Sequence, residues 1–272
     1  MKKKLFIVIA AILILSAVLI VMNMRRGPCL LQPGAFGASS GANALLSQAK
    51  DFQAKGDLAG AKGAYKKLLE DHFDSRDVME WQKRIEELNL KLLFSPVVTD
   101  GSLLYEIKPG DTLSGIAKEF NTTADLIKKS NNITDDKIFP GRNIKVWNGS
   151  FNIFVDKSQN LLILKFGEEV IKTYAVSTGK DNSTPPGDFT IVNKLDHPTW
   201  FKAGAVVPAD SPENILGTRW LGFNLPGYGI HGTTDPASLG SQVTQGCVRM
   251  SNTEVEELYT IVPTGTEVTI VD

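Results

Sequence analysis

The stretch Thr244-Gln245-Gly246-Cys247-Val248-Arg249-Met250 decides how the C-terminal part of the chain folds. Read as a strand, its period of two places Cys247 and Arg249 on one face and Val248 and Met250 on the other, toward a core. A thiol and a guanidinium then share one surface. The pattern therefore predicts a strand with one structural face and one face available for chemistry.

The residues around this stretch indicate a mostly β domain over 151–271. Apolar runs of strand length recur upstream with turn residues between them, at 151–155, 161–166, 170–176, 189–192 and 220–225. Downstream, Ser251-Asn-Thr-Glu254 is typical of a capping box that opens a helix, which fixes where the strand over 244–250 ends.

A second short stretch, Gly229-Ile-His231-Gly-Thr233, supplies a histidine. A free cysteine has a pKa of about 8.5, so a nucleophilic one needs a base or a positive charge beside it. His231 and Arg249 are the candidates for Cys247. We expect the backbone N–H groups of Gly246 and Cys247 to face the oxyanion of a tetrahedral intermediate. The residues alone leave one alternative open, because free cysteines are often buried small hydrophobes.

Together the two stretches resemble the catalytic signature of the L,D-transpeptidases, which are bacterial cysteine enzymes of the cell wall. That signature is His-Gly-Thr, an interval, and then Ser/Thr-x-Gly-Cys-Ile/Val-Arg-Met/Leu; here 15 residues separate His231 from Cys247. Thr184-Pro-Pro-Gly-Asp-Phe-Thr-Ile191 and Ser211-Pro-Glu-Asn-Ile-Leu-Gly217 match as well. Many members have histidine where this chain has Gln245. The resemblance covers 151–271 and implies an L,D-transpeptidase-like β sandwich or barrel.

The resemblance also implies a reaction on peptidoglycan stem peptides, without a cofactor. The Cys247 thiolate, its proton taken by His231, attacks the carbonyl of the third, diamino-acid residue and expels the terminal D-alanine. A side-chain amine of a second stem then resolves the thioester and forms a cross-link. The carbonyl of Gly232 orients the imidazole, and Arg249 pairs with a stem carboxylate, unless it forms a salt bridge to an acid of the domain. Two further positions are expected to contact substrate, Thr233 and Gln245.

Other functions remain open at this point. A water molecule that resolves the thioester makes the protein an L,D-carboxypeptidase, and a decayed catalytic domain leaves a membrane-anchored peptidoglycan-binding scaffold. Sortases also run histidine, cysteine, arginine in chain order, but they have threonine directly before the cysteine, where this chain has Gly246. Papain-like wall peptidases place the cysteine before the histidine.

Residues 103–148 show the order strand, helix, helix, strand. Tyr105-Glu-Ile-Lys-Pro-Gly-Asp-Thr-Leu113 predicts a strand, a turn and a helix capped by Asp111 or Thr112. Asn131-Asn132 ends a second helix, Phe139-Pro140-Gly141 is a turn, and Ile144-Lys-Val-Trp147 alternates as a strand. The segment resembles a LysM domain.

LysM domains bind glycans that contain N-acetylglucosamine, in a groove between two loops. The resemblance implies that the groove here consists of Gly110, Asp111, Thr112, Ile138, Phe139 and Pro140. The alternative for Asp111 and Thr112 is that they only close the helix. For the module as a whole we expect glycan binding.

Residues 44–94 are helical by periodicity, with a break at Gly56-Asp57. The hairpin around this break resembles a tetratricopeptide repeat, because Ala61 allows close helix approach and Tyr65 lies in the second helix. A third helix with Trp81 on its apolar stripe supplies further packing. We expect a spacer or a small helical bundle without a ligand, and a possible protein partner of this module stays unknown.

The N-terminal residues have the features of a membrane-targeting segment. After Lys2-Lys-Lys4, the run 5–22 has Ser16 as its only polar residue, and at ~1.5 Å per residue it spans ~27 Å, enough for a bilayer. A cleaved signal peptide has a shorter apolar region and a small-residue site, whereas Asn23-Met-Arg-Arg26 follows here. We expect an uncleaved anchor over 1–26, a flexible linker over 27–43, a cytoplasmic N-terminus and a catalytic domain outside the cytoplasm.

Charge and composition exclude other classes. The formal net charge of -1 argues against nucleic acid as the main partner. By segment it divides into +5 for 1–26, -1 for 27–100, +1 for 101–150 and -6 for 151–272. The two cysteines, Cys29 and Cys247, lack metal-site spacing, and the three histidines are scattered, so we expect no metal.

Overall fold

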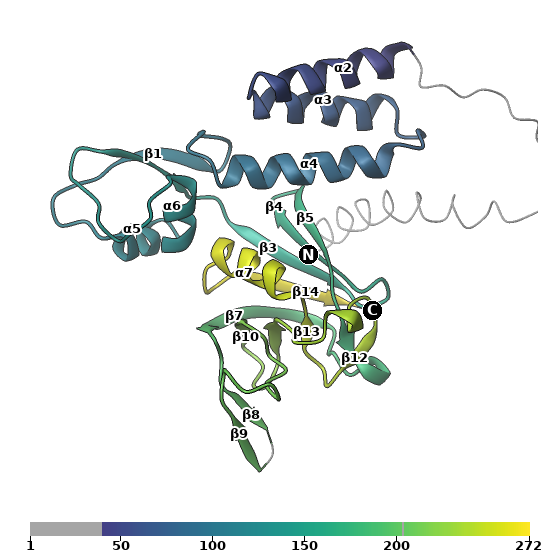
Figure 1. Cartoon of the computed structure of the whole chain (residues 1–272), viewed down its shortest axis with the longest axis vertical. Helices are drawn as coiled ribbons and strands as arrows, with labels where there is room; N and C mark the ends of the chain where they lie inside the picture. The colour runs from purple at the N-terminus through teal and green to yellow at the C-terminus, as the bar shows by residue number, and fades with distance from the viewer. Residues whose placement is uncertain (1–39, 203) are drawn as a thin grey trace, which may run out of the picture. The chain divides into compact units, whose positions relative to one another are not determined.

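The computed structural model describes residues 40–202 and 204–272 (Figure 1). The predicted membrane anchor, most of the predicted linker and Cys29 lie outside the described residues. Within the part of the chain that is described, no helix is long and apolar enough to cross a membrane.

Three helices form the N-terminal module: α2 (Ser40–Ala54), α3 (Leu58–Asp71) and α4 (Val78–Leu93). The Asp57 side chain caps α3 by accepting the N–H of Gly60 at 2.8 Å. The core of the module includes Ala61, Leu68 and Leu88, each without exposed surface. Residues 40–43, which we expected in the linker, belong to α2 because Ala42 is buried against this core.

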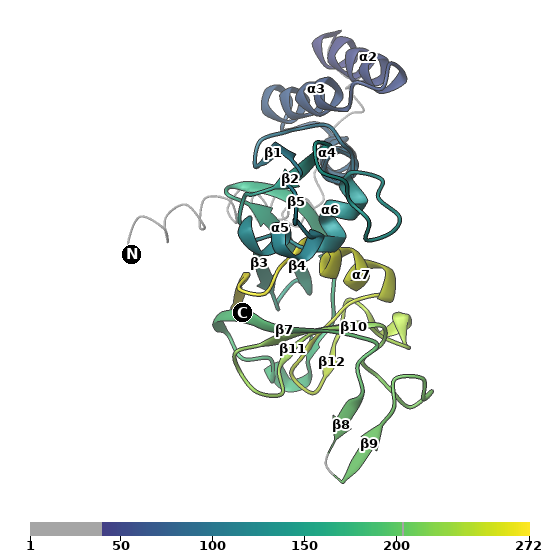
Figure 2. The ribbon, with the colours of Figure 1, turned by 90° about the vertical axis from the view of Figure 1, so that its left-hand side faces the viewer.

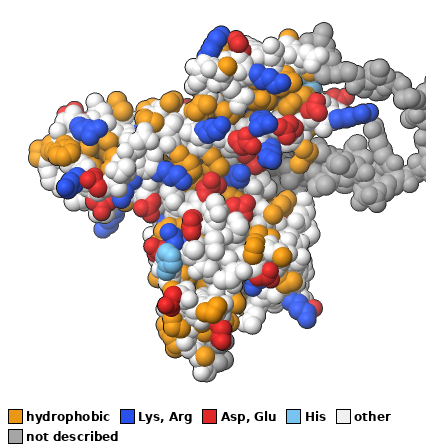
Figure 3. Space-filling view, viewed as in Figure 1, with side chains coloured by type: hydrophobic (Ala, Val, Ile, Leu, Met, Phe, Trp, Pro, Cys, Tyr) orange, Lys and Arg blue, Asp and Glu red, His pale blue; other side chains and the backbone are white. Residues whose placement is uncertain are grey.

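Charged side chains of both signs are interspersed on the outside of this module (Figure 3). Arg84 contacts Glu80 at 2.9 Å and Glu87 at 3.0 Å along α4, and Lys67 contacts Asp71 at 3.0 Å along α3. These are exposed pairs one helical turn apart, of the kind that stabilise a helix by about 0.3–0.5 kcal/mol each. They give the module a solvated outer face.

The next module has the predicted order of strand, helix, helix and strand: β1 (Ser102–Glu106), α5 (Leu113–Glu119), α6 (Ala124–Ser130) and β2 (Asn143–Trp147). β1 and β2 pair antiparallel. Thr112, and not Asp111, caps α5, because its hydroxyl accepts the N–H of Gly115 at 3.0 Å. The Asp111 carboxylate closes the preceding turn instead, accepting from Lys108 N at 2.7 Å and from the Tyr105 hydroxyl at 2.9 Å.

The C-terminal domain is built on one mixed sheet of eight strands in the order β13-β11-β10-β7-β14-β3-β4-β5. Its strands are β3 (Phe151–Asp156), β4 (Leu161–Phe166), β5 (Glu169–Ala175), β7 (Gly187–Asp196), β10 (Arg219–Phe223), β11 (Gly229–His231), β13 (Val248–Arg249) and β14 (Glu267–Val271). The long strand β7 joins the two halves of the sheet, because its residues 187–190 pair with β14 and its residues 191–196 pair with β10.

The two ends of this sheet meet. Ser177, just beyond β5, exchanges two backbone hydrogen bonds of 2.8 Å with Arg249 of β13. The sheet therefore curls until its outer strands touch, which agrees with the expected sandwich or barrel. The five strands predicted upstream correspond to β3, β4, β5, β7 and β10.

Shorter elements complete the domain: β6 (Thr178–Gly179), η1 (Lys180–Asn182), β8 (Trp200–Lys202), β9 (Ala205–Val207), η2 (Pro236–Ser238), β12 (Gln242–Thr244) and α7 (Asn252–Ile261). β12 pairs with β6, and β8 pairs with β9. The expected capping box is present, because Ser251 Oγ accepts the N–H of Glu254 and donates to its carboxylate at 2.7 Å. α7 then packs over β10 and β11 (Figure 2).

Helix α4 contacts both other modules. Asn89 donates to the Val170 carbonyl at 3.0 Å, and Glu86 accepts from the Thr173 hydroxyl at 2.9 Å, so α4 lies along strand β5. At the other end of α4, the buried ammonium group of Lys145, on β2, donates to the carbonyl of Leu92 at 2.7 Å. Burial lowers the pKa of Lys145 to about 8.

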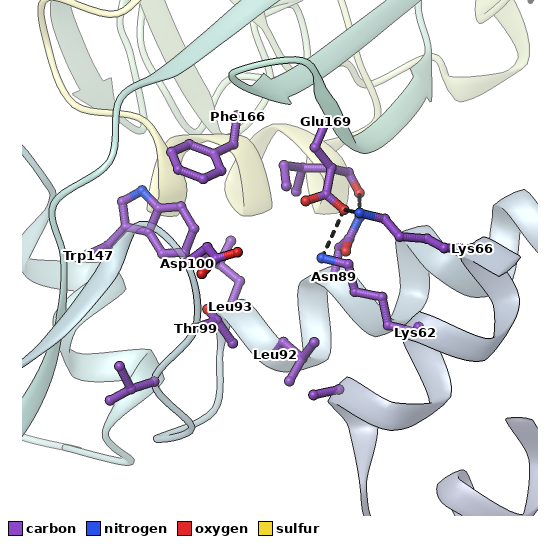
Figure 4. A pocket seen from close by; sticks show the side chains of 14 residues that line it. Lys62, Lys66, Asn89, Leu92, Leu93, Thr99, Asp100, Trp147, Phe166 and Glu169 are labelled. Carbon is purple, nitrogen blue, oxygen red and sulfur yellow. Dashed lines mark hydrogen bonds and ion pairs between the residues drawn. The ribbon is translucent and has the colours of Figure 1, made fainter.

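A cleft of about 380 Å³ opens where α3 and α4 face Trp147 and the β4–β5 turn (Figure 4). Lys62 and Lys66 both contact Glu169 there, at 2.8 and 2.9 Å. Burial acts to raise the pKa of Glu169, but the two ammonium groups lower it on balance. Three charged side chains of this cleft, Lys62, Lys66 and Glu169, are thus paired with one another.

Candidate active site

Strands β11 and β13 bring the predicted catalytic residues together. They run parallel, with Ile230 opposite Val248 and His231 opposite Arg249. Cys247 lies in the bend just before β13, two residues from Arg249, and the alternating burial of residues 247–250 is what assigns it to the same face as Arg249 and His231. Val248 and Met250 have no exposed surface, whereas Cys247 and Arg249 are half-buried. The alternating burial expected from the sequence is observed, but the predicted strand is shorter than expected, because residues 245–247 form a bend between β12 and β13.

His231 is buried and has one ring nitrogen engaged. Its Nδ1 lies 2.6 Å from the carbonyl oxygen of Gly232. Since a carbonyl only accepts, Nδ1 carries the hydrogen and Nε2 is left unprotonated. Burial lowers the pKa of His231 to about 4. Hydrogen bonding to the backbone of Gly232 and Leu216 acts to raise this pKa, and the positive charge of Arg249 lowers it further. The imidazole is therefore neutral at neutral pH, which is the state that a general base requires.

Cys247 is a thiol at rest in this environment. Burial raises its pKa, while the backbone of Gly229 and the charge of Arg249 act to lower it. The thiol donates to the carbonyl of Gly227 at 3.5 Å. A neutral thiol and a neutral imidazole thus share the face, so a proton transfer must precede or accompany nucleophilic attack.

Arg249 forms a polar contact without an ion pair. Its guanidinium donates to Ser238 Oγ at 3.0 Å, and its buried Nε has no partner. No carboxylate among the described residues forms an ion pair with it, so the salt bridge considered as an alternative is absent from the described part. Its charge is available to the thiol, the imidazole and an anionic substrate group.

Of the two backbone groups expected to bind an oxyanion, one is engaged. The N–H of Gly246 donates to Thr244 Oγ1 at 3.2 Å, whereas the N–H of Cys247 has no acceptor among the described residues. Gly246 has φ +123°, and a Cβ there would lie 2.7 Å from the Tyr228 ring and 3.2 Å from the Ser183 carbonyl. A glycine is thus required directly before the cysteine.

The predicted substrate contacts differ in accessibility. Gln245 is exposed beside the site. Thr233 is buried, and its hydroxyl accepts the N–H of Asp235 at 2.9 Å, so it closes a turn. Its own N–H donates to the side chain of Asn252 at 3.0 Å. Asn252 was missed as a site residue because its sequence context, Ser-Asn-Thr-Glu, indicated only the start of a helix.

The residues expected to bind glycan lie in two loops that touch. The N–H of Gly141 donates to the carbonyl of Ile107 at 2.8 Å, which joins the loop before β2 to the loop before α5. Gly110 has φ +89°, as the turn there requires. Phe139 is 58% exposed, and Ile138 and Pro140 flank it. Asp111 and Thr112 have the capping roles described above, and glycan binding at these loops stays a prediction.

Comparison with known proteins agrees with this geometry. Two family models match, one for the L,D-transpeptidase catalytic domain over residues 150–270 and one for the LysM domain over residues 105–147. YkuD of Bacillus subtilis, whose name classes it with the L,D-transpeptidases, is 34% identical over 175 residues, which is 62% of this chain and 98% of that protein. The chain belongs to the L,D-transpeptidase family.

Two further comparisons place this L,D-transpeptidase among its relatives. YqjB of Bacillus subtilis, also classed by name with the L,D-transpeptidases, is 40% identical over 126 residues, covering 44% of this chain and 70% of that protein. The solved L,D-transpeptidase of Mycobacterium smegmatis is 21% identical with a TM-score of 0.37, covering 48% of this chain and 64% of that one. The assignment of this transpeptidase to the family rests on the Bacillus relatives.

Proposed function

We propose that this L,D-transpeptidase cross-links peptidoglycan stem peptides by acyl transfer through Cys247. The observation that supports it best is the parallel pairing of β11 with β13. The pairing sets His231 opposite Arg249, two residues from Cys247, which supports a neutral imidazole with Nε2 unprotonated as the base for the thiol. The neighbouring LysM module, which belongs to a family of glycan-binding domains, holds the enzyme on the wall.

Acylation begins with a proton transfer. His231 Nε2 takes the proton from the Cys247 thiol, and the sulfur attacks the carbonyl carbon of the diamino-acid residue in the donor stem. The negative charge that develops on the carbonyl oxygen is stabilised by the N–H of Cys247. The C–N bond to the terminal D-alanine breaks, and its nitrogen takes the proton from the imidazolium. The products are a thioester and free D-alanine.

The displaced pKa of His231 suits both halves of this cycle. A neutral imidazole is available at neutral pH to accept the thiol proton, and the imidazolium, with a pKa of about 4, is then a strong acid toward the leaving amine. In the second half the acceptor amine attacks the thioester carbonyl. His231 takes the proton from this amine, and the Cys247 sulfur leaves with that proton.

Arg249 has two uses in the proposed reaction. Its positive charge favours the thiolate form of Cys247. Because no described carboxylate is paired with it, its planar guanidinium is also available to a stem carboxylate. Exposed Gln245, at the mouth of the site, is proposed to contact the stem.

We also propose that the protein is a single-pass membrane protein with its N-terminus in the cytoplasm. Residues 5–22 are long enough to span a bilayer, and the substrate of the family lies outside the cytoplasmic membrane. Protease added to intact spheroplasts is expected to digest the LysM and catalytic domains while an N-terminal epitope stays protected. If neither end is digested, the proposed orientation is wrong.

The decisive experiment is a muropeptide profile of cells that produce the wild type, Cys247→Ala or Cys29→Ala. Cys29→Ala is the matched control, since it removes the other cysteine of the chain. Cross-links between two diamino acids are expected to disappear only with Cys247→Ala. Disappearance of tripeptide stems alone identifies an L,D-carboxypeptidase, and an unchanged profile identifies a peptidoglycan-binding scaffold.

A further inference from the structure

One peptide group is held from both sides beside His231. The carbonyl of Gly232 accepts the Nδ1 hydrogen of His231 at 2.6 Å. The N–H of the same peptide group belongs to Thr233, and it donates to Asn252 Oδ1 at 3.0 Å. The chain of contacts therefore runs from the imidazole through one peptide group to the amide side chain of Asn252.

The position of Asn252 is fixed independently of this peptide. Its Oδ1 also accepts the N–H of Thr218, at 3.2 Å, next to the start of β10. A Cβ at Gly217 or at Gly232 would lie 2.2 Å from this oxygen. Two glycines thus leave the space in which the amide oxygen sits. The capped start of α7 sets the backbone of Asn252, so the oxygen is held by both the helix and the strand.

We propose that Asn252 is a positioning residue of the transpeptidase, acting on His231 through the Gly232–Thr233 peptide. By holding the N–H of this peptide, Asn252 fixes the direction of its carbonyl. The carbonyl in turn keeps the hydrogen on Nδ1 and the lone pair on Nε2, toward the thiol. Hydrogen bonds in series polarise one another, so donation to Asn252 also makes the carbonyl a better acceptor.

This inference rests on the proposed function, because only a histidine that acts as a base needs its tautomer fixed. Groups that orient a metal-bound imidazole through its second nitrogen typically change affinity or activity by about 10–100-fold when removed, and we expect an effect of the same order here. The competing explanation is that Asn252 only stabilises the start of α7 and the adjoining turn. The two explanations differ in what they predict for the tautomer of His231 and for the acylation rate of a folded Asn252→Leu variant.

The test uses the full-length protein as wild type, Asn252→Asp, Asn252→Leu and Asn131→Leu. Aspartate keeps an oxygen acceptor for both N–H groups and adds a negative charge, whereas leucine keeps the size and removes the acceptor. Asn131→Leu is the matched control: the Asn131 side chain also bonds a strand backbone, at Lys145 N and O, but it lies in the LysM module. The rate of Cys247 acylation by a carbapenem is followed by intact mass between about pH 4 and 8.

Asn252→Leu is expected to slow acylation about tenfold or more. Asn252→Asp is expected to stay within a few-fold of the wild type at neutral pH, but to move the acid limb of the profile upward by about half a pH unit, since a nearby negative charge favours the imidazolium. Asn131→Leu is expected to change neither. An acid limb of Asn252→Asp that coincides with the wild type overturns the proposal, whether or not Asn252→Leu folds. A folded Asn252→Leu with the wild-type rate overturns it as well.

Nitrogen-15 NMR of the imidazole separates this proposal from the proposed function, because it needs no substrate. The wild type is expected to show a single tautomer protonated at Nδ1, and Asn252→Leu a mixture of both. If the wild type is not acylated at all, the proposed function fails while the NMR comparison still tests Asn252. An unchanged single tautomer in folded Asn252→Leu would falsify the positioning role.

Discussion

His231 lies directly opposite Arg249 in the parallel pair of β11 and β13. A neutral imidazole and a permanent positive charge therefore project from neighbouring strands toward the same side. The charge lowers the pKa of His231 and acts to lower the pKa of Cys247, so it disfavours the imidazolium and favours the thiolate. One residue thus biases both partners of the proton transfer, in the directions that suit a neutral base and a reactive thiol.

Removal of this charge should raise both pKa values. We expect Arg249→Met to move the alkylation midpoint of Cys247 upward by about one pH unit and Arg249→Lys to move it less, because lysine keeps the charge. The measurement is the rate of iodoacetamide alkylation against pH, in a Cys29→Ala background so that one thiol reacts. Equal midpoints in wild type and Arg249→Met would show that the charge does not reach the sulfur.

Burial of neutral His231 makes folding depend on pH. Its pKa falls from 6.5 to about 4 on folding, so between these values the unfolded chain binds the proton and the folded protein does not. The folded state should therefore lose up to about 3 kcal/mol of stability as pH drops from 6.5 toward 4, and this part should be absent from His231→Gln. Urea unfolding at neutral pH and near pH 4.5 measures it. A wild type and a variant with the same pH slope contradict the assignment.

The exposed aromatic ring of the LysM loops provides a test of glycan binding. We expect Phe139→Ala to weaken binding to insoluble peptidoglycan about tenfold, since exposed aromatic anchors contribute strongly to binding. Cosedimentation measures the effect. Phe73→Ala is the matched control, because Phe73 is 74% exposed but lies between α3 and α4, in the helical module. Equal losses in both variants, or none in either, argue against these loops as the groove.

The contact between Lys145 and the end of α4 should be required for the LysM module to stay docked. Lys145→Met keeps most of the side chain but removes the donor of the Ser95 carbonyl and one of the donors to the Leu92 carbonyl, at a cost of about 1–3 kcal/mol. We expect faster proteolysis within residues 95–101, with carbapenem acylation of Cys247 unchanged. Lys128→Met, which removes the partner of exposed Asp136, is the control. Unchanged proteolysis means that other contacts suffice.

Local patterns allowed much of the fold to be predicted from the sequence. Val248 and Met250 alternate with Cys247 and Arg249, and Ser251 begins a helix, because both features depend on neighbours a few residues apart. Contacts between distant residues could not be predicted. Lys145 alternates as an ordinary strand residue, and nothing near it indicates that its ammonium group is buried against a helix 53 residues earlier.

The site shows the same division. His231 and Cys247 were identified from their motif, but the parallel pairing that joins them depends on strand order, which no local pattern encodes. The sequence around Asn252 indicates only a helix cap. Its two hydrogen-bond donors, the N–H groups of Thr233 and Thr218, lie 19 and 34 residues away and are not evident from local sequence. We expected the N–H of Gly246 to donate to an oxyanion. In the structure it donates to the hydroxyl of Thr244, two residues earlier.

Helix α4 has a protective consequence for the sheet. β5 is the last strand in the sheet order. The unpaired N–H and carbonyl groups of such an edge strand can form a β-ladder with another polypeptide chain. Asn89 donates to the carbonyls of Val170 and Ile171, and Glu86 accepts from the N–H and the hydroxyl of Thr173, so these polar groups of β5 already have partners on α4. The helical module, which the sequence predicts as a spacer, therefore also protects the edge of the sheet from pairing with another chain. A catalytic domain without this module should tend to self-associate.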